Sequence, residues 1–225
     1  MPAPILIAQR ALEYVNDGDV VGLGTGRAAT AFVQALGARC RDGLRVRGIP
    51  TSKVTADLAT QLGIPLISLD EVTGIDVTVD GADEVDPQLN LIKGYGAALV
   101  REKIVAAASK RMIVLIGTEK LVPVLGTRGK LPVEVVPFGA AFCRRRLTDM
   151  GYPATLRLDG SRPLVSDNGN SILDCQVPAI ADPEQLERSI VAIPGIVGTG
   201  LFLRMAEIIL IEDGQTVQVR QRTPR

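Results

Sequence analysis

The sequence contains no histidine and no tryptophan, and aromatic residues make up only 3% of its 225 positions. Without histidine, the chain can build neither a Ser-His-Asp triad, nor a Cys-His pair, nor a histidine-ligated metal site. Any proton transfer must therefore use carboxylates, lysine, tyrosine or cysteine. The scarcity of aromatic rings also disfavours a surface on which nucleic-acid bases stack.

The sequence also lacks an excess of either charge, because 25 Lys and Arg balance 25 Asp and Glu. No net field attracts the protein to nucleic acid or to an anionic membrane. Its three cysteines (Cys40, Cys143 and Cys175) form no CxxC pair, which is typical of reduced thiols in the cytoplasm. No apolar run approaches the ~18 residues that span a membrane, and residues 1–19 fit an amphipathic helix better than a signal peptide. We expect a soluble cytoplasmic protein.

Residues 1–128 alternate between short β-rich runs and helical patterns, which predicts βαβ units around a mainly parallel sheet. Strands are expected at 19–23, 45–49, 65–68, 75–79 and 112–116, and helices near 27–37, 52–62 and 97–109. A hairpin around Asp213-Gly214, within residues 203–225, is expected to complete this Rossmann-like α/β domain.

The pattern changes in residues 129–202, where the expected order is strand, helix, two strands and helix. Asn168-Gly169 predicts the turn between two strands, and Asp182 followed by Pro183 predicts a helix start. This order indicates a smaller α+β domain of ferredoxin-like type, inserted into the larger one.

Residues 22–29 (GLGTGRAA) follow a predicted strand and open a predicted helix. Backbone N–H groups at such a helix start form an anion site. Residues 24–29 also fit the G-x-G-x-x-A pattern of dinucleotide-binding loops, but that reading requires an acid at the end of the second strand, where the sequence has IPTSK. A single phosphate therefore fits better than NAD; a tight turn without a ligand is the alternative.

Asp80 and Asp83 follow the strand 75–79 directly, at the carboxyl end where open α/β sheets bind ligands. The alternative is a solvated turn in which the aspartates bond their own backbone. Glu84 and Asp86, further along the same segment, are expected to be solvated.

Glu102 lies on the predicted helix 97–109, and its neighbours three and four residues away are all apolar: Ala98, Leu99, Val105 and Ala106. Desolvation raises the pKa of a carboxylate towards the range that suits a general base. Arg101 and Lys103 have apolar neighbours too, so spacing does not single out Glu102, and an ion pair is the alternative for it.

Two lysines also lie where a ligand would bind. Lys93, in the glycine loop IKGYGAAL, could reach an oxyanion or a phosphate as a mobile charge, and Lys120 follows the strand 112–116. The alternative for each is an ordinary surface lysine.

Together the segments GLGTG, TSKVT, DVTVDGADEVD, IKGYGAALVREKIVA and GTEK resemble ribose-5-phosphate isomerase of the A type, and the resemblance covers nearly the whole chain. It implies interconversion of ribose 5-phosphate and ribulose 5-phosphate in the pentose phosphate pathway, without metal or cofactor. It also implies a cytoplasmic homo-oligomer, most often a dimer.

The resemblance further implies residue roles. Glu102 would move a proton between C2 and C1 through an enediolate, while Asp80, Asp83 and Lys93 would bind hydroxyls, assist ring opening and stabilise the oxyanion. The remaining substrate-binding positions that it implies are Thr25, Gly26, Arg27, Ala28, Gly81, Ala82, Gly94, Tyr95, Gly96 and Lys120.

Two departures from the family pattern matter. The family's GTGST reads GTGRA here, so Arg27 and Ala28 replace two hydroxyl donors, and we hypothesise that Arg27 contacts the phosphate instead. The family's KGGG reads KGYG, and Tyr95 could crowd the pocket, line a subunit contact, or carry strain if its φ is positive. An isomerase of altered specificity, or a sugar-phosphate sensor without turnover, therefore stays as an alternative.

Overall fold

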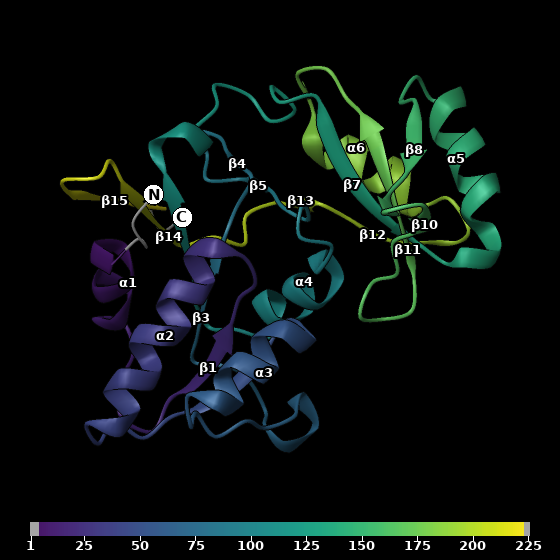
Figure 1. The fold of residues 1–225 in the computed structure, drawn as a ribbon. Coiled ribbons are helices and arrows are strands. Elements are labelled where there is room, and N and C mark those ends of the chain that lie inside the picture. The colour runs from purple at the N-terminus through teal and green to yellow at the C-terminus, as the bar shows by residue number, and fades with distance from the viewer. Residues whose placement is uncertain (1–4, 223–225) are drawn as a thin grey trace. The chain divides into compact units, whose positions relative to one another are not determined.

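The computed structural model describes residues 5–222, and its contacts divide the chain into two compact units (Figure 1). Unit 1 consists of residues 1–82, 101–120 and 204–225, and unit 2 of residues 83–100 and 121–203. The predicted division placed 83–100 and 121–128 in the first domain, whereas these residues make their contacts within unit 2. No helix in residues 5–222 is long and apolar enough to cross a bilayer.

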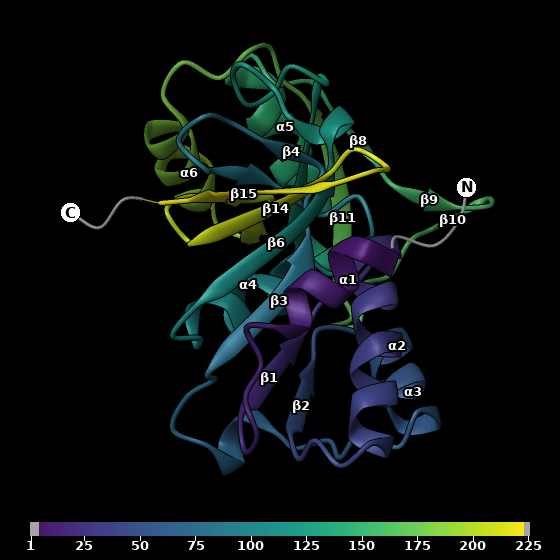
Figure 2. The ribbon, with the colours of Figure 1, turned by 90° about the vertical axis from the view of Figure 1, so that its left-hand side faces the viewer.

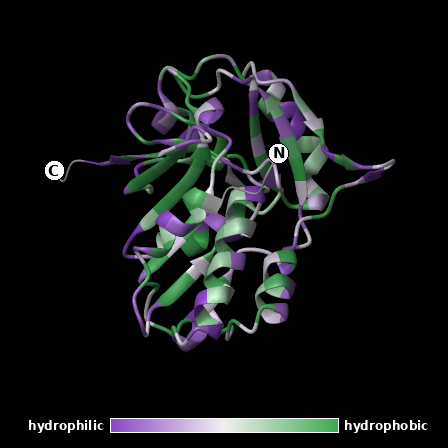
Figure 3. Cartoon of the chain, turned by 60° about the vertical axis from the view of Figure 1, so that its left-hand side comes forward, coloured by the Kyte–Doolittle hydropathy of each residue, from purple (hydrophilic) through white to green (hydrophobic). Residues whose placement is uncertain are grey.

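Unit 1 is built on a six-stranded sheet in the order β15-β14-β6-β3-β1-β2. Every neighbouring pair is parallel except β14 with β15, and the prediction of a mainly parallel α/β sheet is confirmed. The four inner strands are largely hydrophobic, as expected for strands covered on both faces (Figure 3), whereas the edge strand β15 is mostly polar and exposed. In chain order they are β1 (Val20–Leu23), β2 (Arg47–Pro50), β3 (Val77–Gly81), β6 (Met112–Gly117), β14 (Ile208–Glu212) and β15 (Val217–Gln221).

Side chains of β1 and β3 alternate between the two faces of this sheet. Val21 and Val79 share a core cluster with residues of α1 (Ile5–Leu12) and α2 (Arg27–Arg41), and these two helices lie side by side in Figure 2. Val20 and Ile75 instead pack with Val105 of α4 (Leu99–Ala107). Helices α1 and α2 thus cover one face and α4 the other, while α3 (Lys53–Gln61) packs on α2 and β2.

The predicted strand at 65–68 is wrong. Only Leu66 forms a bridge, to Gly48 of β2. The chain then turns into the 3-10 segment η1 (Leu69–Glu71), because Ser68 caps it: its hydroxyl accepts from Asp70 N and its N–H donates to the Glu71 carboxylate.

Unit 2 contains a four-stranded sheet in the order β12-β7-β11-β8, with all neighbours antiparallel. Its chain order is β7 (Lys130–Val135), α5 (Ala140–Asp149), β8 (Ala154–Leu156), β11 (Ser171–Gln176), α6 (Pro183–Val191) and β12 (Ile196–Thr199). The order βαββαβ is that of a ferredoxin-like domain, and it adds β12 to the predicted order of strand, helix, two strands and helix. The predicted cap of α6 is present, because the Asp182 carboxylate accepts a bond from Gln185 N at 2.9 Å.

Unit 2 also holds short strands outside that sheet. A three-stranded sheet is formed by β4 (Glu84–Val85), β5 (Leu91–Ile92) and β13 (Leu201–Phe202), and a small hairpin by β9 (Leu158–Asp159) and β10 (Arg162–Pro163). Two further 3-10 segments are η2 (Thr118–Lys120) in unit 1 and η3 (Pro137–Gly139) in unit 2.

Candidate active site

Asp80 is a buried carboxylate that links the first glycine loop to β3 in unit 1. It is fully buried on β3, and its Oδ1 accepts from Thr25 N at 3.0 Å and from Gly81 N at 2.7 Å. The first glycine loop and the carboxyl end of β3 are therefore brought together as predicted. The alternative of a solvated turn fails for Asp80, because the side chain has no exposure.

Gly24 permits this contact because it has no side chain. A Cβ built on Gly24 would lie 2.3 Å from Asp80 Oδ1 and 2.6 Å from Asp80 Cα, closer than real Cβ atoms approach. Gly22 is equally constrained, since its Cβ would lie 2.6 Å from Val105 on α4. The glycines of this motif thus let α4 and the Asp80 carboxylate approach β1 closely.

Three hydroxyl side chains surround Thr25. Thr25 was predicted as a site residue, but Thr51, Ser52 and Thr55 were not. Thr25 Oγ1 lies 2.7 Å from Thr51 Oγ1, 2.9 Å from Ser52 Oγ and 3.3 Å from Thr55 Oγ1. Thr55 Oγ1 also donates to Gly24 O at 2.9 Å. The signal for this cluster was present as TSKVT directly after β2; its three hydroxyl residues fix the loop from the neighbouring strand.

Glu102 is buried, with 4% of its surface exposed, and its four apolar neighbours are buried with it: Ala98, Leu99, Val105 and Ala106. Arg101 and Lys103 are only partly buried, so burial singles out Glu102 where spacing did not. The C-terminal end of α4 is fixed near the start of β3, because Ser109 Oγ lies 2.5 Å from Thr78 Oγ1. The N-terminal end of α4 therefore points towards the carboxyl ends of the strands.

This direction places Glu102 relative to Asp80. Val105 faces Gly22, and Glu102 lies about one helical turn before Val105, towards Gly24. Asp80 lies two residues after Thr78 on β3, so both project from the face of the sheet that α4 covers. Glu102 and Asp80 are consequently on the same face of the sheet, near the same strand ends.

Four further predicted residues lie near these strand ends. Gly26, with φ 105°, precedes α2, and Arg27 and Ala28 open that helix, with Arg27 exposed. The first N–H groups of a helix have no acceptor within it, so this end can bind an anion. Lys120 is partly buried in η2, directly after β6, which is the neighbour of β3.

Asp83 and Lys93 lie close together within unit 2. Asp83 N donates to Ile92 O at 2.8 Å, and its carboxylate accepts from Tyr95 N at 3.0 Å. Lys93 is 2% exposed, and its Nζ lies 5.4 Å from the centre of the Phe202 ring. The alternative of a surface lysine is therefore wrong for Lys93. Its backbone is bonded to the chain segment around Gly200, because Lys93 N donates to Gly200 O at 2.8 Å.

Tyr95 carries no backbone strain. The positive φ angles of this loop fall on Gly94 (105°) and Ala97 (62°), not on Tyr95. The Tyr95 ring packs against the apolar cluster of unit 2, and Lys130 Nζ lies 4.2 Å above its centre. Burial, together with the charges of Asp83 and Glu84, raises the pKa of Tyr95 to about 12.

We expect alkaline pH to unfold the wild type more readily than Tyr95→Phe. The Tyr95 pKa is raised above the ordinary value of 10.0, so its contribution to stability is complete below pH ~10 and is lost as pH rises towards 12. Because the ring is only partly buried, we expect a difference of about 1 kcal/mol between the two proteins in this range. Urea unfolding at neutral pH and between pH 10 and 12 measures it. Equal losses of stability in both proteins would contradict the raised pKa of Tyr95. Burial also raises the pKa of Cys175 to about 12, but this thiol contributes equally to both proteins.

The expectation that Glu84 and Asp86 are solvated is wrong. Glu84 is fully buried, and its two oxygens accept from Gly126 N at 2.7 Å and from Arg128 N at 2.8 Å. Asp86 is 6% exposed and accepts from the backbone of Gln88 and Asn90. Both acids stabilise chain turns of unit 2, so within this acidic segment Asp80 and Asp83 are the candidates for chemistry.

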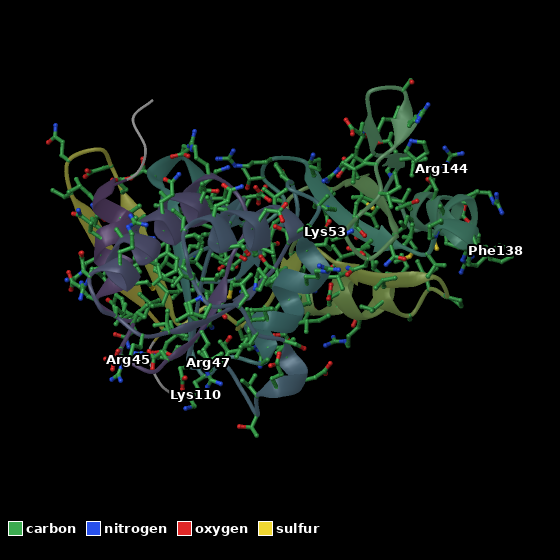
Figure 4. All side chains as sticks on the ribbon, turned by 60° about the horizontal axis from the view of Figure 1, so that its bottom comes forward. Arg45, Arg47, Lys53, Lys110, Phe138 and Arg144 are labelled. Atoms are coloured by element: carbon green, nitrogen blue, oxygen red, sulfur yellow. The ribbon has the colours of Figure 1, made fainter. Side chains whose placement is uncertain are left out.

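A cleft of about 750 Å³ opens elsewhere in unit 1, beside the amino ends of β1 and β3. Its lining includes Arg47 and Lys110, both labelled in Figure 4, and Lys110 Nζ pairs with Asp76 at 2.7 Å. It contains none of the predicted site residues and lies at the opposite strand ends. Among the described residues, no group of three or more cysteine and acidic side chains is arranged to hold a metal ion.

Comparison with known proteins identifies the family. The model for ribose 5-phosphate isomerase A (phosphoriboisomerase A) matches residues 47–216. The chain belongs to this family. Ribose-5-phosphate isomerase A from Roseiflexus sp. strain RS-1 is 54% identical over 207 residues, covering 91% of this chain and 89% of the relative. The enzyme of the same name from Bradyrhizobium diazoefficiens is 48% identical, covering 96% and 93%.

Solved structures of the ribose 5-phosphate isomerase A family share the fold. The Methanocaldococcus jannaschii enzyme superposes with a TM-score of 0.92 at 40% identity, covering 96% of this chain and 97% of that one. A D-ribose-5-phosphate isomerase in complex with phospho-erythronic acid gives 0.93 at 39% identity, covering 96% of each chain. The family resemblance and the fold class predicted from the sequence are both confirmed.

Proposed function

We propose that the protein interconverts D-ribose 5-phosphate and D-ribulose 5-phosphate, with Glu102 as the general base. The observation that carries the catalytic assignment is the buried Glu102, on the same face of the sheet as the buried Asp80 and near the same strand ends. Family membership supports the substrate, and one solved relative is a complex with a phosphorylated sugar acid.

The proposed reaction moves one proton from C2 to C1 and one proton from O2 to O1, with no net gain or loss of atoms. Glu102 removes the proton from C2 of the open aldose, and the electrons of that C–H bond form an enediolate as the C1 carbonyl oxygen takes up negative charge. The proton of the C2 hydroxyl passes to O1, which moves the negative charge to O2. The protonated Glu102 then returns its proton to C1 as the carbonyl forms at C2, and the ketose results. One carboxylate serves both carbons because they are adjacent.

The other roles follow from charge and position. The Lys93 ammonium is suited to stabilise the developing oxyanion. Because Lys93 is buried, its electrostatic attraction to that oxyanion is stronger than it would be in water. Asp80 and Asp83 bind sugar hydroxyls and assist ring opening, with Gly81 and Ala82 in the chain between them. Thr25, Gly26, Arg27, Ala28 and Lys120 are the proposed phosphate and substrate contacts of unit 1, and Gly94, Tyr95 and Gly96 accompany Lys93 in unit 2.

The direct test is ketose formation from ribose 5-phosphate by the purified protein. We expect turnover with the phosphorylated pentose and very little with ribose, because the phosphate supplies binding energy. A panel of other aldose phosphates tests the alternative of altered specificity. Binding of ribose 5-phosphate without ketose formation would instead identify a sugar-phosphate sensor.

Replacing Arg27 tests the proposed phosphate contact at the start of α2. We expect Arg27→Ala to raise KM for ribose 5-phosphate about 10-fold, with little change in kcat, because an exposed arginine contributes a charge-assisted bond in ground state and transition state alike. The matched control is Arg39→Ala, an exposed arginine in the last turn of the same helix. An unchanged KM in Arg27→Ala would refute the contact.

We further propose that the protein works in the cytoplasm as a homo-oligomer, most simply a dimer. Support comes from its scarce, unpaired cysteines and from exposed apolar side chains such as Phe138, labelled in Figure 4, and Phe142. Light scattering of the purified protein measures the subunit number, and a monomeric mass at micromolar concentration would contradict the proposal.

A further inference from the structure

Arg157 lies between β8 and β9 in unit 2 and is far from the lysine loop in sequence, yet it binds that loop directly. Its side chain is only 10% exposed, and Nη1 donates to Gly94 O at 2.9 Å and to Tyr95 O at 3.1 Å. A guanidinium that meets two backbone carbonyls at once fixes both direction and distance.

The guanidinium is itself held by Asp174 on β11. Arg157 Nε donates to Asp174 Oδ2 at 2.9 Å and Nη2 donates to Oδ1, which is a two-point pair between planar groups. Lys130 Nζ lies 3.6 Å from the same carboxylate and 4.2 Å from the centre of the Tyr95 ring. The Asp174 carboxylate thus pairs with two cations: Arg157, which binds the backbone of the lysine loop, and Lys130, which lies over the Tyr95 ring.

These contacts fix one peptide group at both ends. The Gly94 carbonyl accepts from Arg157, and the N–H of the same peptide, that of Tyr95, donates to the Asp83 carboxylate at 3.0 Å. On the other side of Lys93, its own N–H donates to Gly200 O at 2.8 Å. Lys93 therefore lies between two peptide groups whose orientation is set by hydrogen bonds to other segments. The Gly94–Tyr95 peptide, which donates to the Asp83 carboxylate, also depends on Arg157.

We propose that Arg157 is a positioning residue for the reaction: through the Gly94–Tyr95 peptide it keeps Lys93 in its working orientation. The inference rests on the proposed role of Lys93. Arg157 touches no reacting atom in this scheme. Misplacement of a charged group by about 1 Å is enough to slow an enzymatic step ~100-fold, which sets the scale of the effect.

The test is a double-mutant cycle between Arg157→Ala and Lys93→Met, with kcat and KM measured for ribose 5-phosphate. We expect Arg157→Ala to lower kcat about 10- to 100-fold and to change KM less than about 3-fold, because the interaction it weakens belongs to the transition state. In the Lys93→Met background the same substitution should lower kcat less than about 3-fold, since residues acting as one unit are not additive. A merely structural role would lower kcat equally in both backgrounds.

Hydrogen exchange supplies a second measurement on the same variants. Amides of residues 93–97 should exchange faster in Arg157→Ala, and Arg157→Lys should restore part of kcat, because a lysine reaches one partner but not the carbonyls and Asp174 together. The matched control is Arg162→Ala, an exposed arginine in the adjacent β9–β10 hairpin, which should behave as wild type. Where Arg157→Ala does not fold, Arg157→Lys and Asp174→Asn carry the same cycle.

The outcomes separate this inference from the proposed function. An inactive wild type, or a fully active Lys93→Met, would show that the proposed function or the role of Lys93 is wrong. An impaired Lys93→Met beside an Arg157→Ala with wild-type kcat would overturn the role of Arg157 alone. Equal effects of Arg157→Ala in both backgrounds would overturn it as well.

Discussion

Replacing Glu102 by glutamine should lower kcat for ribose 5-phosphate about 1,000-fold while the protein still binds its substrate. Glutamine has the shape of glutamate but cannot accept a proton, and a general base contributes roughly 100- to 10,000-fold. Because Glu102 is buried in α4 among apolar neighbours, the amide fits without repacking and fold stability should hold. Ketose formation measures kcat, and loss of deuterium from C2-labelled substrate reports the proton transfer itself.

A matched substitution distinguishes this effect from the loss of one negative charge. Asp57→Asn makes the same carboxylate-to-amide change on the exposed face of α3 and should leave kcat within about 2-fold. If Glu102→Gln retained kcat within a few-fold of wild type, the base would have to be another residue and the proposed mechanism would be wrong.

Adding one methyl group at Gly24 should also disable the protein. In Gly24→Ala the new Cβ would lie 2.3 Å from Asp80 Oδ1 and 2.6 Å from Asp80 Cα, and the second contact is with backbone, which cannot rotate away. We expect a loss of about 2 kcal/mol in the free energy of unfolding, in the range of overpacked cores. We expect kcat/KM to fall ~100-fold, because Asp80 must separate from the loop that its carboxylate holds through Thr25 N.

Gly74→Ala is the control for this change. Its Cβ would have Ala108 O at 3.5 Å as nearest atom, an ordinary contact, and it lies at the other end of β3. Urea unfolding and kcat/KM should both stay close to wild type. A stable, active Gly24→Ala protein would show that the close approach of Asp80 to β1 is not needed.

Sequence patterns predicted the elements whose signal is local. The run MIVLIG became β6 because a strand covered on both faces needs a continuous apolar run, and Asp182-Pro183 capped α6 as expected. The strand expected at 65–68 failed because Ser68 and Glu71 turn the chain into η1 after one bridge. The apolar run favours a strand and the capping box favours a helical turn. Which of the two forms depends on how far the neighbouring strand β2 can pair with this segment.

The site residues also divide into those with a local sequence signal and those whose partners are distant in the sequence. The position of Asp80 was predictable, because the strand end and the glycine loop both have local signals in the sequence. The burial of Glu102 was suggested by the apolar neighbours on its own helix, but Arg101 and Lys103 have such neighbours too, and only the fold distinguishes Glu102 from them. The burial of Glu84 was not predictable, since its partners are backbone N–H groups of Gly126 and Arg128, about 40 residues further along the chain. Arg157 was missed for the same reason: what it does depends on carbonyls that only the fold brings to it.

The order β14-β6-β3 in the sheet of unit 1 has a consequence for synthesis on the ribosome. One side of β6 pairs with β3, which precedes it, but the other side waits for β14, and residues 121–203 of unit 2 are made in between. During that interval the nascent chain carries an apolar strand with one unsatisfied row of amide and carbonyl groups, the kind of edge that recruits other chains. Released chains that end before Ile208 should therefore need chaperones, whereas released chains that include Glu212 should not.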